Sequence, residues 1–169
     1  MAACGRSLQV AVLKGRANYL CLHRLQRALA SPPTDPRVRA ELLRIAVFAQ
    51  ATATGDRAAL DGVPDASAAW PLATSTADNC LGGQCPAWAQ CFVAAARRKA
   101  MAADVVVVNH HLLLADCALR ERWPDGGLLA QFGVVVIDEA HALADTATAF
   151  FGHTVSSRRV GALVADLAG

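Results

Sequence analysis

No run of apolar residues in this sequence approaches the roughly 18 to 20 that a membrane-spanning helix needs. The first 15 positions also lack the basic and then apolar pattern of a secretory signal. Both absences argue against the membrane and secreted classes of protein. We therefore expect a cytoplasmic protein without a membrane partner.

Large side chains that fill a core well are scarce. Hydrophobic residues make up 54% of the 169 residues, but 37 of them are alanines and only 5% of the chain is aromatic. The chain is long enough for one ordinary domain. Its core-forming residues, however, are concentrated in a few runs.

Acidic residues are absent from two windows, 1–34 and 79–103. These windows carry eight Lys and Arg residues between them, although the net charge of the whole chain is only +2. Both windows also contain cysteines of one spaced pattern, namely Cys21, Cys80, Cys85 and Cys91. If one metal site gathers those thiolates, it also gathers the cations into one basic patch.

Several helices are predicted from capping and periodicity. Asp35 can cap a helix whose first position suits Pro36 and which should run to about Thr52. Asn109 is expected to cap another at a strand-to-helix turn. Further helical segments are expected at 20–29, 92–103, 111–122 and from 142 onwards, loosening around 152–157.

Two β-branched runs, 105–108 and 132–137, are typical of buried parallel strands. With the intervening helix they predict a βαβ unit. Residues 54–79 are instead rich in Gly, Asp, Ser, Thr, Pro and Ala with a single Trp70, which predicts an irregular segment. We expect a metal centre, rather than a core, to order it.

The cysteine pattern is Cys21-x58-Cys80-x4-Cys85-x5-Cys91. Structural zinc sites usually pair their ligands in short knuckles on both sides, and only one gap here fits. Four cysteines without supporting histidine are what a [4Fe–4S] cluster requires. The alternatives are separate buried cysteines or a disulfide, and the glycine-bearing loop 79–91 argues against the first of these. Cys4 and Cys117 lie outside the pattern.

A second motif follows the second β-branched run, at Asp138-Glu-Ala-His141. Two carboxylates at the carboxyl end of a parallel strand lie where phosphate sites form in open α/β sheets. Asp138 can hold Mg²⁺ through water, and Glu139 can orient or deprotonate an attacking water.

Several other residues have two interpretations. Trp70 and Trp88 either stack on DNA bases or pack a small metal module, and packing is favoured. His110 and His111 either bind a metal or belong to the strand-to-helix turn, which is favoured because neighbouring side chains diverge. The run Arg97-Arg98-Lys99 is either a solvated helix face or a DNA contact, whereas Arg158 and Arg159 are treated as surface.

Taken together, Leu13-Lys-Gly-Arg-Ala-Asn-Tyr-Leu-Cys21, the three later cysteines, Val106-Val-Val-Asn-His-His-Leu-Leu113 and Asp138-Glu-Ala-His141 resemble the DinG and YoaA helicases, bacterial relatives of the XPD group. The resemblance implies a superfamily 2, 5′ to 3′, ATP-dependent DNA helicase of repair or replication. The implied fold is α/β, a partial P-loop-type (RecA-like) parallel-sheet motor domain with a mostly helical four-cysteine iron–sulfur insert.

The resemblance also assigns roles along the chain. Residues 1–13 would end a first motor segment, 14–99 form the iron–sulfur insert, 100–145 a motor βαβ segment with the DEAH box, and 146–169 the start of a helical, arch-like segment. The four cysteines of the pattern become the cluster ligands, and His141 would couple nucleotide state to DNA binding. Single-stranded or forked DNA would contact six cations, Lys14, Arg16, Arg24, Arg97, Arg98 and Lys99.

One departure from the family pattern concerns ATP. The sequence contains no G-x-x-x-x-G-K-[ST] phosphate loop. We therefore expect an internal fragment of the helicase that has no ATPase activity alone. The rival hypothesis is a stand-alone nucleic-acid-binding four-cysteine metal module with a vestigial acidic motif.

Overall fold

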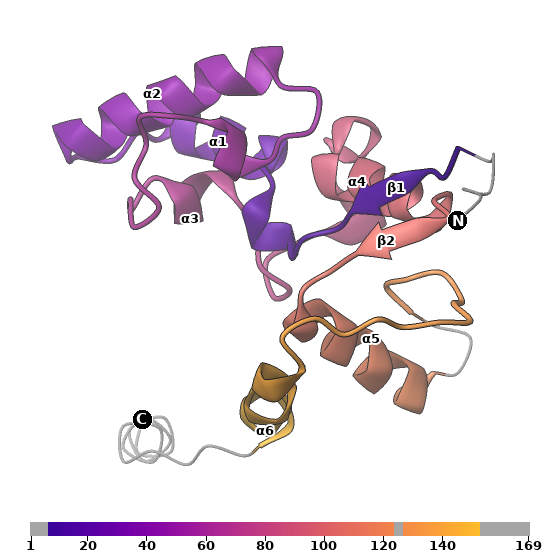
Figure 1. Cartoon of the computed structure of the whole chain (residues 1–169). Coiled ribbons are helices and arrows are strands. Elements are labelled where there is room, and N and C mark those ends of the chain that lie inside the picture. Colours follow the sequence, from indigo (N-terminus) through magenta and orange to yellow (C-terminus); the bar gives the residue numbers. More distant parts are fainter. Residues whose placement is uncertain (1–6, 124–126, 153–169) are drawn as a thin grey trace.

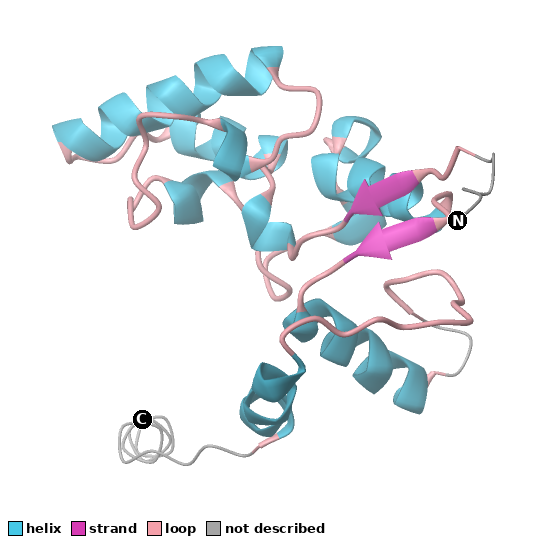
Figure 2. Ribbon diagram, viewed as in Figure 1, coloured by secondary structure: helices cyan, strands magenta, loops and turns pink. Residues whose placement is uncertain are grey.

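The computed structural model describes residues 7–123 and 127–152, which form a mixed α/β structure that is mostly helical (Figures 1 and 2). Its elements in chain order are β1 (Val10–Val12), α1 (Leu22–Ala30), α2 (Pro36–Ala51), α3 (Trp70–Ala73), α4 (Phe92–Met101), β2 (Val105–Val107), α5 (His110–Arg122) and α6 (Leu143–Phe151). Short 3₁₀ turns connect several of them. None of the helices in these ranges is long and apolar enough to cross a membrane.

Two of the predicted helix starts are confirmed by their capping bonds. The Asp35 side chain accepts a hydrogen bond from the backbone N–H of Arg37 at 2.8 Å, and α2 begins at Pro36. Asn109 likewise accepts from the backbone N–H of Leu112 at 2.9 Å, and α5 begins with the next residue. In both cases a side chain satisfies a backbone donor that the first helical turn leaves free.

The sheet consists of β1 and β2, which pair in parallel with Val10 opposite Val105 and Val12 opposite Val107. In sequence, all the helices from α1 to α4 therefore lie between two strands that are neighbours in the sheet. α1, α2 and α3 form a lobe on one side of the sheet, and α4 runs beside the strands (Figure 1). The mostly helical insert expected before the second strand thus matches the arrangement of elements.

The lobe has its own hydrophobic core. We call it the lobe core, and its buried residues are Leu20, Leu25, Leu42, Ile45, Val63, Ala69, Trp70 and Ala73. A second, smaller cluster, the sheet core, packs around Ala11, Leu13, Ala100 and Leu129. Phe92 at the start of α4 contacts the lobe core, and Ala100 near its end lies in the sheet core. α4 therefore connects the two.

Gly55 allows α4 to approach the lobe. A Cβ atom at this position would lie 2.3 Å from the Phe92 ring, and its φ of +65° is in the left-handed region that favours glycine. Any larger residue at position 55 would push the first turn of α4 away from the lobe.

The expectation that residues 54–79 are not ordered by a hydrophobic core is wrong. Val63 and Trp70 are 7% and 2% exposed and belong to the lobe core. The Trp70 indole N–H donates to the Pro64 carbonyl at 3.0 Å, and the Arg57 guanidinium lies 4.9 Å from the ring centroid. One large aromatic side chain with a satisfied polar atom anchors the segment, which composition alone understates.

The βαβ unit predicted within 100–145 is also wrong, because residues 132–137 form no strand in the described structure. Val134 is 81% exposed and Val136 89%. We call 132–137 the apolar segment. A strand needs a neighbour for its backbone N–H and C=O groups, and none of the described strands lies beside this segment. β2 does form and is parallel, but two of its three residues are exposed rather than buried.

Some expectations fall on residues outside the described ranges. They concern Cys4, most of the turn at 124–127, the pair Arg158–Arg159 and the helical stretch beyond residue 152.

Candidate metal centre and acidic motif

Cys21 is held in place by the lobe. The preceding Leu20 is 1% exposed, and its backbone N–H donates to the Gly55 carbonyl at 2.8 Å. The Cys21 N–H donates to the Ala73 carbonyl, also at 2.8 Å. The backbone around Cys21 is thus fixed between two other segments by hydrogen bonds that need no metal.

The other three cysteines lie on the loop that leads into α4. Two 3₁₀ turns, Gly82–Gln84 and Trp88–Gln90, shape this loop. The N–H groups of Cys85 and Cys91 close these turns, donating to the carbonyls of Gly82 and Trp88 at 3.1 Å each. The turns therefore set where two of the thiols stand.

All four cysteines of the predicted pattern line one cavity, although the lobe separates the first from the others in sequence. Each is half-buried. Among the described residues, no group of three or more His, Cys, Asp or Glu side chains is placed to hold a metal ion.

Cys117 stands apart from this cavity. It is exposed on α5 and is not among the residues that line the cavity.

Opposing electrostatic influences act on the thiols of the cavity. Cys21 and Cys91 are the capping residues before α1 and α4, so the positive ends of two helix dipoles lie beside them. Burial raises the pKa of the Cys21 thiol, the backbone N–H of Arg24 opposes this by donating to the sulfur, and the other three cysteines raise it further. Loading with a cationic metal centre would relieve that repulsion between thiolates.

Arg97 also belongs to this environment. Burial lowers the pKa of its guanidinium and nearby Arg16 adds to the effect, whereas the sulfurs of Cys80 and Cys91 oppose it. Two of the cations predicted to contact DNA therefore lie close to each other, and Arg97 also lies close to these two sulfurs.

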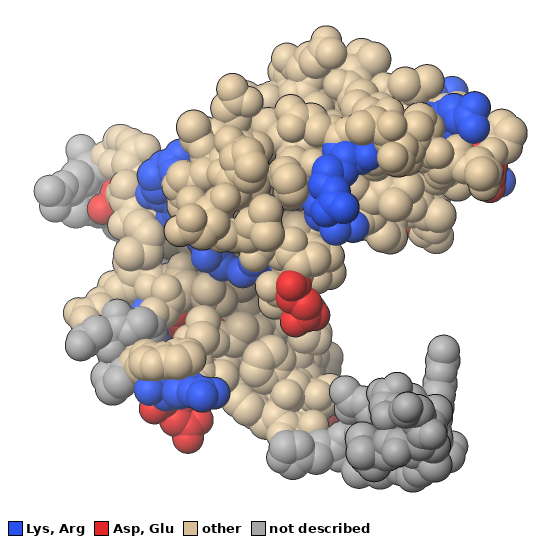
Figure 3. All heavy atoms as spheres, turned by 180° about the vertical axis from the view of Figure 1, so that it is seen from behind, with Lys and Arg blue, Asp and Glu red and all other residues tan. Residues whose placement is uncertain are grey.

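The other predicted DNA contacts have different surroundings. The Lys14 ammonium forms an ion pair with Asp56 at 2.5 Å. A guanidinium N–H of Arg24 donates to the Pro71 carbonyl at 2.7 Å, and its buried Nε has no partner. Arg98 and Lys99 are exposed on α4. On the face drawn in Figure 3, Lys and Arg form several separate groups rather than one patch.

The acidic motif is exposed and lies next to the start of α5. The Asp138 carboxylate accepts from the Glu139 N–H at 2.9 Å, and His110 Nε2 lies 3.0 Å from the Asp138 carbonyl, so Nε2 must carry the proton it donates. His141 Nδ1 is 3.3 Å from a Glu139 carboxylate oxygen.

Glu139 has a φ of 49°, in the left-handed region that non-glycine residues rarely adopt. Strained backbone of this kind occurs at functional sites more often than elsewhere. The strained backbone is that of Glu139, whose carboxylate the sequence assigns to orienting the attacking water.

Sequence reasoning missed a buried ion pair that positions the chain before this motif. Asp116 is fully buried and pairs with Arg120 at 2.7 Å. Asp116 also accepts from the N–H groups of Leu128 and Leu129 at 2.6 and 2.9 Å. The available signal was an Asp and an Arg four residues apart on a predicted helix.

The DEAD_2 family model matches residues 81–160, a region that includes Cys85, Cys91 and the acidic motif. The ATP-dependent DNA helicase YoaA of Escherichia coli is 47% identical over 94% of this chain. The chain is related to the YoaA and DinG helicases. YoaA of Haemophilus influenzae is 44% identical and the ATP-dependent helicase DinG of Mycobacterium tuberculosis 36%, each over 94% of this chain. The chain spans 25% of the length of each of these relatives.

Proposed function

We propose that this chain is part of an ATP-dependent DNA helicase of superfamily 2, of the iron–sulfur DEAH-box type, with 5′ to 3′ polarity and a role in DNA repair or replication. The observation that carries the proposal is the meeting of Cys21 with the three cysteines of the 79–91 loop in one cavity. The names of the YoaA and DinG relatives supply the ATP-dependent helicase activity.

In this proposal Cys21, Cys80, Cys85 and Cys91 hold a [4Fe–4S] cluster. The donor set fits, since four thiols line one cavity, together with His23, and the N-termini of α1 and α4 favour the negative charge of thiolates. Bound there, the cluster would supply a covalent tether between the lobe and α4. The chain's own residues set the ligand positions through backbone hydrogen bonds.

Asp138, Glu139 and His141 would form part of an ATP site. Asp138 would hold Mg²⁺ through water and Glu139 would orient or deprotonate the water that attacks the γ-phosphate. His141, 3.3 Å from Glu139, would couple the nucleotide state to DNA binding. Positioning of the γ-phosphate requires a phosphate loop that this sequence does not contain.

The proposed division of the chain follows from these roles. Residues 1–13 and 100–145 belong to the RecA-like motor, 14–99 to the iron–sulfur insert and 146–169 to the start of an arch-like helical segment. Single-stranded or forked DNA would contact the cations nearest the cysteine cavity.

The test of the cluster is the metal content of the chain purified without oxygen. The protein should be brown and contain about four irons per chain, because four thiolates can each bind one iron of a cubane. Cys21→Ser should bleach it, although Cys21 lies far from the other three in sequence. Cys117→Ser is the matched control and should keep the colour. A colourless protein with one stoichiometric zinc would refute the cluster.

The second test concerns ATP. The 169-residue chain should hydrolyse none, with or without DNA, because its carboxylates can act only on a phosphate that other residues hold. DNA-stimulated turnover that disappeared in Glu139→Gln would contradict this.

A further inference from the structure

Trp88 differs from the other tryptophan of the insert. Trp70 is 2% exposed in the lobe core, whereas Trp88 is 43% exposed. Trp88 therefore remains partly accessible to solvent, although it also lines the cavity of the four cysteines. The position of Trp88 is nevertheless fixed, because it begins the turn between Cys85 and Cys91 and its N–H donates to the Cys85 carbonyl at 2.9 Å.

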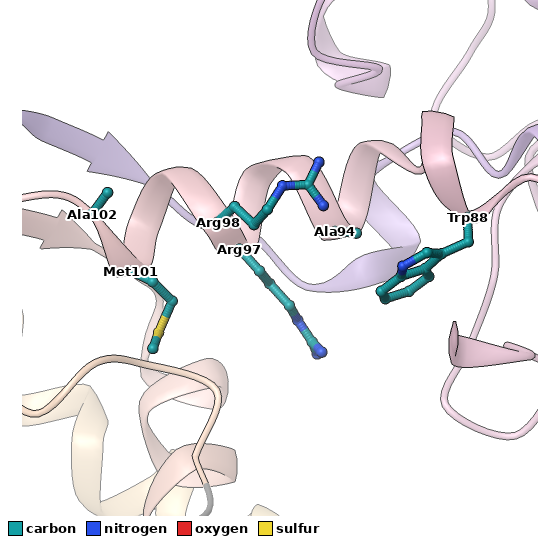
Figure 4. A pocket seen from close by; sticks show the side chains of 6 residues that line it. All are labelled: Trp88, Ala94, Arg97, Arg98, Met101 and Ala102. Atoms are coloured by element: carbon teal, nitrogen blue, oxygen red, sulfur yellow. The ribbon is translucent and has the colours of Figure 1, made fainter. Parts of the chain in front are cut away.

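A broad surface depression of about 450 Å³ adjoins the Trp88 side chain. Its lining consists of one aromatic, two guanidinium groups, one thioether and two methyl groups, from Trp88, Arg97, Arg98, Met101, Ala94 and Ala102. Figure 4 shows these side chains along α4, with the Trp88 ring beyond its first turn. No acidic side chain lines the depression, and the surrounding stretch 79–103 contains none.

The two arginines have different environments. Arg97 is half-buried and lies close to Arg16 and to the sulfurs of Cys80 and Cys91. Arg98 is exposed and its guanidinium is drawn extending along α4 toward Ala94. Arg98 is therefore the cation of this depression that is free to bind an anion from solution.

We propose that this depression binds one unpaired nucleotide of single-stranded DNA, with the base stacked on Trp88 and the adjacent phosphate held by Arg98. An open apolar floor with an aromatic ring and an exposed cation is the combination that binds single strands without sequence preference. Met101, 55% exposed, lies at the opposite end of α4 from Trp88 and extends the apolar floor of the depression.

Charge and shape favour this occupant over others. The depression is too open to enclose a small molecule, and it offers no carboxylate or amide to orient one. The positive charge and the aromatic face complement a polyanion whose bases are exposed. The inference rests on the DNA-binding function proposed above and adds the site and the mode of contact.

The experiment compares two oligonucleotides of equal length, one of thymidine and one of abasic sites, because both carry the same phosphate charge. The full chain, purified without oxygen with its iron, should bind the thymidine oligonucleotide about tenfold more tightly, as expected for stacking of one base. Trp88→Ala should remove that preference and leave affinity for the abasic strand unchanged. Trp88→Phe should keep most of it.

Two further variants isolate the contacts. Trp123→Ala, which truncates another exposed tryptophan at the end of α5, is the matched control and should bind like the parent. Arg98→Ala should weaken binding of both strands and flatten the salt dependence by about 0.7 in the logarithmic slope. Iron content and visible absorption measured on each variant report whether the cysteine loop is intact.

The outcomes separate the inference from the proposed function. If the parent binds the thymidine strand but Trp88→Ala and Trp88→Phe bind both strands as the parent does, the stacking site is refuted and a protein partner becomes the occupant to seek. Equal weakening of both strands by Trp88→Ala would also refute it, since loss of stacking cannot act on an abasic strand. Failure of the parent to bind either strand would refute the DNA-binding function itself.

Discussion

Trp70 in the lobe core is 2% exposed, whereas Val134 in the apolar segment is 81% exposed. Both are large apolar residues, but the stretches of chain around them differ. Trp70 lies in a segment poor in large side chains, yet α1 and α2 provide the surface that covers it. Val134 lies in a run of β-branched residues, and none of the described strands pairs with it. Burial thus depends on the partner surface more than on the hydrophobicity of the segment itself.

The largest effect is expected when Trp70, the aromatic residue that anchors the lobe, is truncated. Trp70→Ala should lower the free energy of unfolding of the lobe by about 3–5 kcal/mol, because it leaves a large cavity beside Val63 and Ala73. Urea denaturation followed by circular dichroism measures the loss. The control Trp123→Ala truncates an exposed ring, and its change should stay within about 0.5 kcal/mol. Equal losses would mean that the lobe core does not hold the lobe.

The second test acts on the ion pair before the apolar segment. Asp116→Ala should cost about 1–3 kcal/mol, because it leaves the buried N–H groups of Leu128 and Leu129 without an acceptor. Hydrogen exchange at 127–130 should accelerate while exchange in α2 stays unchanged. Glu121→Ala, an exposed acid on the same helix, provides the comparison. Unchanged exchange in the Asp116 variant would show that the pair does not hold this segment.

The third test removes one proposed metal ligand and leaves the residues of the lobe core unchanged. Cys85→Ser should abolish iron binding, yet proteolysis should open only the loop 79–91, because the lobe core contains no cysteine. The effect on unfolding of the lobe should be smaller than that of Trp70→Ala. Limited proteolysis with mass spectrometry locates the cuts. Cleavage within 54–75 would instead show that the metal is needed to order that segment.

The smallest effect is expected in the apolar segment. Val134→Ser should change the free energy of unfolding by no more than about 0.5 kcal/mol, since the side chain loses no packing. It should also reduce self-association, because it interrupts an exposed apolar patch. Light scattering and urea denaturation of the same sample measure both. A loss above 1.5 kcal/mol, about that of a buried side chain, would mean that the segment is covered in solution.

Local signals in the sequence predicted α2 and α5 well. Asp35 with Pro36, and Asn109, act within one helical turn, so their hydrogen bonds need no knowledge of the rest of the fold. The fate of 132–137 depends on a neighbouring strand. No pattern within the segment can report whether that neighbour is present, so its burial was predicted wrongly.

The residues of the candidate site likewise divide into those that local sequence signals predict and those that depend on the rest of the fold. Spacing and residue type were enough to select Cys21 with the three later cysteines, and the structure places all four around one cavity. The single basic patch was less predictable, because charge windows in the sequence do not show that Lys14 pairs with Asp56. Asp116 was missed because an acid on a helix is usually solvated.

β1 and β2 pair across a long separation in sequence, as the register of Val10 opposite Val105 shows. A ribosome therefore releases β1 long before it makes β2, so this pair of strands cannot form while the lobe is synthesised. Closing so long a loop costs more chain entropy than forming the short-range contacts of α1 and α2. Folding of the lobe shortens that loop, so a nascent chain completes its lobe before its sheet.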